Sequence, residues 1–102
     1  MTYSVKISPT AFIQINEAVK FVSNVSYEAA TKLYHEIMEA ANSLKEMPLR
    51  YPKVDFLKIP SGEVHKTTLS NGRYAFLFIV SKDVVNIDLF TDLRQKNNSI
   101  LL

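Results

Sequence analysis

One stretch, His65 to Gln95, constrains the fold of this chain more than any other. It contains three strand-like segments separated by two short turns. Asn71-Gly72 in the first turn is a strong tight-turn signal because both residues tolerate positive φ. The stretch therefore predicts a three-stranded antiparallel meander over Val64–Leu69, Tyr74–Val80 and a last strand that begins at Val84.

The middle and last strands of this meander predict different surroundings. Tyr74–Val80 is apolar on both alternating faces, which is typical of a central strand covered on both sides. The last strand alternates, so we expect one core face and one polar working face, on which Phe90 is an apolar exception. The core face would carry Val85, Ile87, Leu89 and Leu93, and the working face Asn86, Asp88, Phe90, Asp92 and Arg94.

The residues before the meander predict a strand and two helices. Tyr3–Ile7 alternates like a short strand, and Ser8 followed by proline is an N-cap signal. Apolar residues then recur at helical spacing, and Ser26 marks a second helix start before Met47-Pro48 ends the pattern. Pro48–Gly62 holds three prolines and predicts an irregular loop. The expected fold is α+β, with an antiparallel helix hairpin covering one sheet.

Composition narrows the class of protein. At 102 residues the chain predicts a single domain, 1–102, and 47% hydrophobic residues predict a compact globule. The absence of cysteine and the presence of two separated histidines exclude a disulfide framework and make a zinc site unexpected. No signal peptide or membrane span is evident, so we expect a cytoplasmic protein, without cofactor or metal. The net charge of +2 permits an acidic or nucleic-acid partner.

Four pieces of sequence, in order along nearly the whole chain, carry a resemblance to a known family. They are Val5-Lys6-Ile7-Ser8-Pro9-Thr10-Ala11, Leu44-Lys45-Glu46-Met47-Pro48-Leu49-Arg50-Tyr51-Pro52, Asn71-Gly72-Arg73-Tyr74 and Asp92-Leu93-Arg94-Gln95 followed by Ile100-Leu101-Leu102. Together they resemble the RelE/ParE toxins of type II toxin-antitoxin systems, a family that includes plasmid-stabilisation modules. The resemblance implies growth inhibition that a cognate antitoxin neutralises in a hetero-oligomer.

The resemblance leaves two targets open. RelE-like members are metal-independent endoribonucleases (mRNA interferases) that cut messenger RNA on the ribosome, and ParE-like members poison DNA gyrase. The fold does not choose between them. A degenerate member that only binds antitoxin is a third alternative.

Candidate catalytic residues follow from the chemistry of RNA cleavage, which needs cations on the phosphate and a proton-transfer group. By position in the family pattern, the strand lysine is Lys66 and the tail arginine is Arg94. The family pattern has a second arginine at the position that Ala75 occupies here. Arg73 could reach over to that position from the turn. The family pattern has a second lysine at the position that Thr68 occupies here. Its tail aromatic is replaced within residues 96–99. His65 is a candidate base.

Other residues are candidates for binding. Basic and aromatic side chains could contact RNA phosphates and bases, and Asp88 with Asp92 could act as paired carboxylates or, more simply, balance Arg94. Apolar residues on the working face and in the tail could contact an antitoxin segment. The RNA-binding candidates are Arg50, Lys53, Lys58, Tyr74 and Lys96, and the partner-binding candidates are Phe90, Ile100 and Leu101. Each also has a plain structural alternative, as a solvated charge or a core residue.

Overall fold

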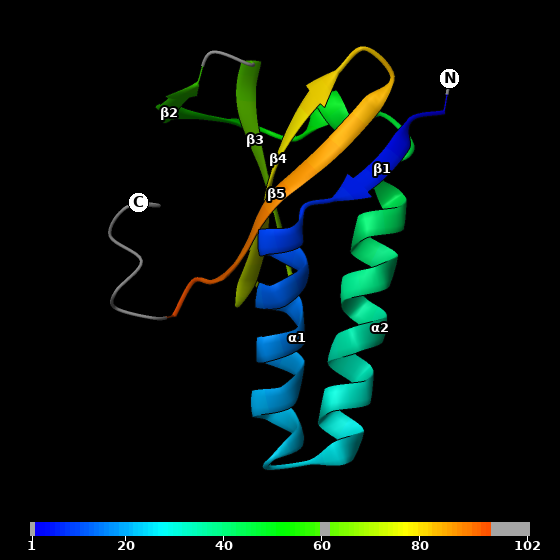
Figure 1. Cartoon of the computed structure of the whole chain (residues 1–102), viewed down its shortest axis with the longest axis vertical. Coiled ribbons are helices and arrows are strands. Elements are labelled where there is room, and N and C mark those ends of the chain that lie inside the picture. The colour runs from blue at the N-terminus through cyan, green and yellow to red at the C-terminus, as the bar shows by residue number, and fades with distance from the viewer. Residues whose placement is uncertain (1, 60–61, 95–102) are drawn as a thin grey trace.

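The computed structural model describes residues 2–59 and 62–94, apart from the side chains of 55–59 and 62. Its elements follow the order of the prediction, with two additions, a 3-10 helix and a strand, in the segment expected to be a loop (Figure 1). They are β1 (Ser4–Ile7), α1 (Pro9–Ser23), α2 (Tyr27–Ser43), the 3-10 helix η1 (Pro48–Arg50), β2 (Lys53–Ile59), β3 (Gly62–Leu69), β4 (Tyr74–Ser81) and β5 (Val84–Asp92).

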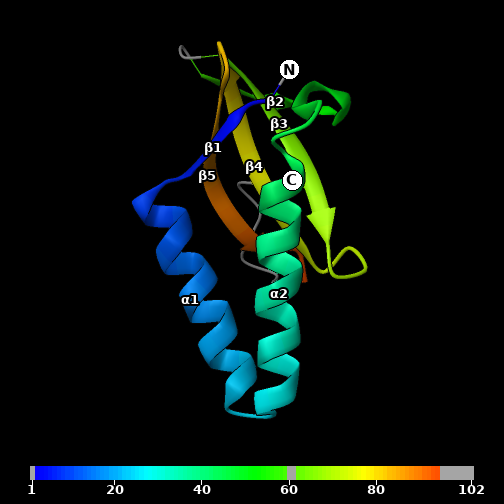
Figure 2. The same ribbon diagram turned by 90° about the vertical axis from the view of Figure 1, so that its right-hand side faces the viewer.

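Both helices begin where the sequence places their caps. Ser8 Oγ accepts a hydrogen bond from the Ala11 N–H at 3.0 Å, and Ser26 Oγ accepts one from the Ala29 N–H at 3.1 Å. Each serine thus satisfies an N–H that the helix itself leaves without a partner. The two helices lie antiparallel on one side of the sheet, and their connecting turn projects beyond it (Figures 1 and 2).

The sheet has five strands in the order β1-β5-β4-β3-β2. β1 runs parallel to β5, and the remaining neighbours are antiparallel. The prediction of an irregular loop over Pro48–Gly62 is wrong in part, because β2 pairs with β3 across an irregular register. The prolines on both sides of β2 led to the prediction of a loop. The strand forms because it pairs with β3 rather than because of local propensity. β3 is consequently an inner strand of the sheet.

The main core lies between the helices and the sheet. Its helix residues include Ala11, Ile15 and Ile37, and its strand residues include Phe76 and Phe78, all 2% exposed or less. A second cluster, formed by Val54, Val64, Leu77 and Ile79 with Leu89 beside it, lies on the other face of the sheet. β4 contributes alternate residues to both clusters, which confirms that this strand is buried on both faces.

A bulge in β5 changes which of its residues face the helices. Leu77 pairs with Leu89, but the next residue, Phe78, pairs with Ile87, so Asp88 is the extra residue. One inserted residue reverses the alternation beyond it. Phe90 therefore joins the helix-side core at 2% exposure, and Leu89 turns to the opposite face. The assignment of Phe90 to the polar working face, and of Leu89 to the helix-side core, is wrong for this reason.

Candidate functional site

The described part of the chain contains a cleft between α1 and the ends of β4 and β5, which we call the strand-end cleft. It has a volume of about 900 Å³, which is within the usual size of ligand sites. Two of the predicted site cations, Arg73 and Arg94, lie in its wall. The complete lining is Gln14, Glu17, Ala18, Phe21, Arg73, Tyr74, Phe90, Thr91, Asp92 and Arg94.

Asp92 organises the strand side of this cleft. Its Oδ2 lies 3.5 Å from Arg73 Nη2, and its Oδ1 accepts a hydrogen bond from the Arg94 N–H at 2.9 Å. The Leu93 N–H donates to the Arg73 carbonyl at 2.7 Å, which ties the exit of β5 to the turn before β4. The sequence placed Asp92 beside Arg94, and the structure shows that Asp92 also holds Arg73.

Aromatic rings form the floor of the strand-end cleft. Tyr74 and Phe90 stack with their centroids 5.1 Å apart, and the Arg73 guanidinium carbon lies 5.0 Å from the Tyr74 centroid. Burial, opposed by the charge of Arg73, raises the pKa of the Tyr74 phenol. The raised pKa favours the protonated phenol, whose hydroxyl can donate a hydrogen bond, and it does not activate Tyr74 as a base.

Gln14 joins the two walls of the cleft. Its Oε1 accepts a hydrogen bond from the Phe90 N–H at 2.9 Å, just beyond the bulge. The contact fixes α1 against the region of β5 that carries Asp92. The residues predicted from the sequence did not include Gln14, Glu17, Ala18 and Phe21. Their one signal in the sequence was helical spacing, because their proximity to β5 depends on the tertiary fold.

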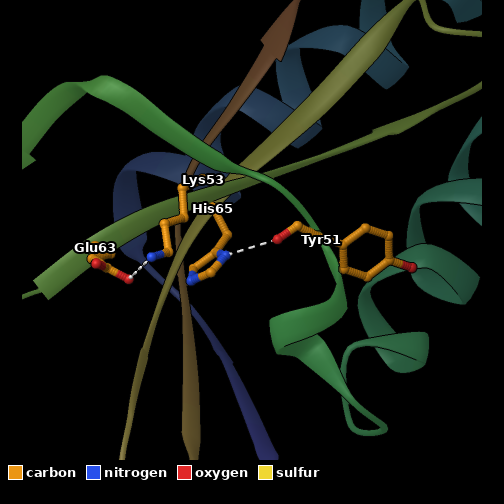
Figure 3. A network of polar contacts seen from close by, with 4 residues as sticks. All are labelled: Tyr51, Lys53, Glu63 and His65. Carbon is orange, nitrogen blue, oxygen red and sulfur yellow. Dashed lines mark hydrogen bonds and ion pairs between the residues drawn. The ribbon is translucent and has the colours of Figure 1, made fainter.

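His65 lies elsewhere, inside the helix-side layer of β3. It is 4% exposed, and its ring stacks on Phe78 with centroids 5.6 Å apart. Its Nδ1 is 2.9 Å from the Tyr51 carbonyl oxygen (Figure 3). Because a carbonyl can only accept, Nδ1 carries the proton and donates it. This burial argues against His65 as a base for a large substrate.

Tyr51 lies beside His65 and is half-buried. Burial raises the pKa of its phenol, but hydrogen bonds with Ser43, Arg50 and Thr67 outweigh that effect and hold the pKa below its ordinary value. Arg50 Nη2 donates to the Tyr51 hydroxyl at 2.7 Å, and its Nη1 donates to the Glu46 carbonyl at 2.7 Å. Arg50 therefore has local structural partners instead of pointing freely into solvent.

The remaining cationic candidates lie outside the lining of the strand-end cleft. Lys66 pairs with Leu77, three positions along β4 from Tyr74, which is about 10 Å of strand. Lys53 forms an exposed ion pair with Glu63 at 3.2 Å (Figure 3). The side chain of Lys58 lies outside the described part of the chain, as do Lys96, Ile100 and Leu101. Among the described candidates, Arg73, Tyr74, Phe90 and Arg94 line one cleft, whereas Lys53 lies opposite His65 in the sheet.

Ala75 and Thr68, which occupy the positions expected for family cations, pair with each other across β3 and β4. Ala75 is fully buried. A guanidinium at this position would need an anionic or hydrogen-bonding partner in the sheet.

No group of three or more metal-ligating side chains occurs within residues 2–59 and 62–94. In those same ranges, the structure holds no helix with the length and hydropathy needed to span a membrane.

Comparison with protein-family models finds no match, and the sequence matches no curated protein. Among solved structures, a chain described as "Chromosomal ParDE TA system from P. aeruginosa" superposes with a TM-score of 0.73 at 18% sequence identity. The match covers 91% of this chain and 98% of that chain. It extends over nearly all of both molecules, and it confirms the predicted RelE/ParE-like α+β fold.

Proposed function

We propose that this protein is the toxin of a type II toxin-antitoxin module, and that it arrests growth by binding its target rather than by cutting RNA. The observation that carries the first part is the fold shared, over 91% of the chain, with a chain of a ParDE system. The four stretches of sequence that resemble the RelE/ParE toxins support the same assignment. The partner on this proposal is a cognate antitoxin, and the target is DNA gyrase.

The arrangement of side chains favours binding over catalysis. A ribonuclease site needs cations and a proton-transfer group around one phosphate. His65 is buried, Lys66 lies along the strand from Arg73, and Ala75 replaces a cation. Burial raises the pKa of Tyr74, in the same cleft as the two arginines, so its surroundings do not activate it as a base. A gyrase poison needs none of these groups to act on a reacting atom.

Inducible expression in a bacterial host tests the first part of the proposal. We expect growth to stop on induction, and to resume when the adjacent reading frame that encodes the antitoxin is expressed with it. Continued growth without antitoxin would show that the chain is not a toxin, and would favour the degenerate antitoxin-binding alternative.

Two parallel assays with purified protein then separate the targets. We expect inhibition of supercoiling by DNA gyrase, and intact ribosome-bound messages by primer extension in a translating extract. Message cleavage with normal supercoiling would replace the gyrase proposal with the ribonuclease alternative.

A further inference from the structure

The turn that joins the two helices carries large apolar side chains that the core does not use. Phe21 is 66% exposed, Val25 is 84% exposed and Tyr27 is 80% exposed. We call residues 21–27 the hairpin tip, and it lies where the helix hairpin projects beyond the sheet (Figures 1 and 2). Small and polar residues are typical of turns, so packing and turn chemistry do not account for these three side chains.

The backbone of the hairpin tip is held by hydrogen bonds. The N–H groups of Val25 and Ser26 both donate to the Val22 carbonyl at 3.0 Å, and Ser23 Oγ donates to the Lys20 carbonyl at 2.7 Å. Val22 packs against the main core, and Ser26 is the N-cap of α2. The exposed side chains are therefore presented from an ordered turn, so that binding through them requires little further ordering of the backbone.

The hairpin tip is also uncharged. Residues 21–27 contain no Asp, Glu, Lys or Arg, although such residues make up 22% of the chain, and the flanking charges, Lys20 and Glu28, have opposite signs. A nucleic acid requires cations against its phosphates, and an anionic membrane surface attracts basic residues. The composition of the tip instead fits an apolar pocket in a protein, where aromatic anchors contribute much of the binding energy.

The exposed area separates two kinds of protein partner. Two aromatic rings and one valine exposed to this extent present about 400 Å² of surface. A stable dimer needs about 800 Å² on each copy, so two tips packed against each other would provide about half of that. A pocket can enclose the projecting tip and also contact the helix surfaces next to it, which favours a concave site on a different protein.

We infer that the hairpin tip is the part of this toxin that inserts into its target, in an apolar and uncharged pocket of DNA gyrase. Val25 and Tyr27 are the anchors, and Phe21 extends the apolar surface along α1. This inference rests on the proposed function and specifies which surface engages the target. Val25 and Tyr27 lie outside the lining of the strand-end cleft, so the target would meet a different surface from the cleft.

Two double variants of the full-length chain test the inference in a gyrase supercoiling assay. Val25→Ala with Tyr27→Ala removes both anchors and leaves Phe21, which also lines the cleft, in place. Phe12→Ala with Ile13→Ala is the matched control, because it removes an aromatic and an aliphatic side chain, each 57% exposed, near the start of α1. Circular dichroism and thermal unfolding should match the wild type in both, since the side chains removed are exposed.

We expect the tip variant to need about ten- to a hundredfold more protein for half-inhibition of supercoiling, and the control less than about threefold more. If the wild type inhibits gyrase and the tip variant inhibits it equally well, the inference is overturned while the proposed function stands. An equal loss in both double variants would also overturn the assignment to the tip. If the wild type does not inhibit gyrase at all, the proposed target fails, and the inference fails with it.

Two further measurements address rival occupants of the hairpin tip. The inference predicts a monomer by sedimentation velocity, and no binding to vesicles of phosphatidylcholine and phosphatidylglycerol. Self-association or vesicle binding that the tip variant abolishes, together with undiminished gyrase inhibition by that variant, would assign the tip to a second copy or to a membrane and overturn the inference.

Discussion

The strand-end cleft and the region around His65 contain similar kinds of residue with different partners. Each has an arginine against a tyrosine ring, with the guanidinium carbon 5.0 Å from the Tyr74 centroid in the cleft and 4.6 Å from the Tyr51 centroid in the other region. In the His65 region, the imidazole and Arg50 bond to nearby backbone carbonyls. In the cleft, Arg94 is exposed at the rim, beside open volume.

We propose that position in the sheet, more than residue type, separates structural from functional groups here. Side chains along inner strands face packed layers, where polar groups must be satisfied internally. Side chains where strands end face a space that a partner can fill. We therefore assign stability to the His65 region and recognition to the strand-end cleft, and the following predictions test that division.

The largest effect is expected at Phe78, whose ring contacts both His65 and Tyr51. Phe78→Ala should lower the free energy of unfolding by about 3–5 kcal/mol, because a fully buried ring is lost and a cavity remains. Urea denaturation measures this change. Phe12→Ala is the control, with an expected change below about 0.5 kcal/mol. A loss below about 1 kcal/mol for Phe78→Ala would mean that this region is not a packed core.

A smaller loss is expected for His65→Ala. The substitution removes the stacked ring and leaves the Tyr51 carbonyl without its donor, which should cost about 1–3 kcal/mol of unfolding free energy. His35→Ala, on the exposed face of α2, should change it by less than about 0.5 kcal/mol. If His65→Ala folded with wild-type stability but no longer arrested growth, His65 would belong to the functional site.

Within the strand-end cleft, Asp92→Ala should have a modest effect on stability. It removes the ion pair with Arg73 and the acceptor for the Arg94 N–H, which together contribute about 0.5–1.5 kcal/mol. Thermal unfolding measures the loss, and Asp83→Ala in the exposed turn before β5 is the control. A loss equal to that of Phe78→Ala would show that the cleft is part of the structural core, contrary to the division proposed.

The smallest effect concerns pH and the bulge residue Asp88. Burial raises the folded-state pKa of its carboxyl above the unfolded value near 4. The folded state then binds the proton more readily, so the contribution of Asp88 to stability falls as pH rises from about 4 through the raised pKa. Because water screens this half-exposed group, the change should stay below about 0.5 kcal/mol.

Denaturation of the wild-type chain and of Asp88→Asn at several pH values checks this sign. The stability of the wild type relative to the variant should decrease from about pH 4 to about pH 6. A relative stability that increases over that interval would mean that Asp88 is stabilised as a carboxylate, for example by an unrecognised cationic partner.

Much of the fold was predictable because its signals are local. The serine caps, the helical spacing of apolar residues and the Asn71-Gly72 turn each act within a few residues, and the structure confirms the helices and the meander they predict. β2 and the bulge at Asp88 were not predictable, since both depend on which residue of a neighbouring strand is paired. The bulge alone moved Phe90 from the expected surface into the core.

The site was predictable only in part, for the same reason. Arg94 beside Asp92 stood out in the sequence, and Tyr74 followed Arg73 at a recognisable turn. Nothing local indicated that α1 would bring Glu17 and Phe21 to face them, because the two walls are about 70 residues apart in the chain.

The division between the two regions is tested most directly by amide chemical shifts of the nitrogen-15-labelled chain during titration with the antitoxin. We expect the largest shifts in residues 14–21 and 90–94, which form the two walls of the strand-end cleft, and little change at His65 or Thr67 on the helix-side layer of β3. Shifts concentrated at His65 and Thr67, with residues 14–21 unaffected, would contradict the account.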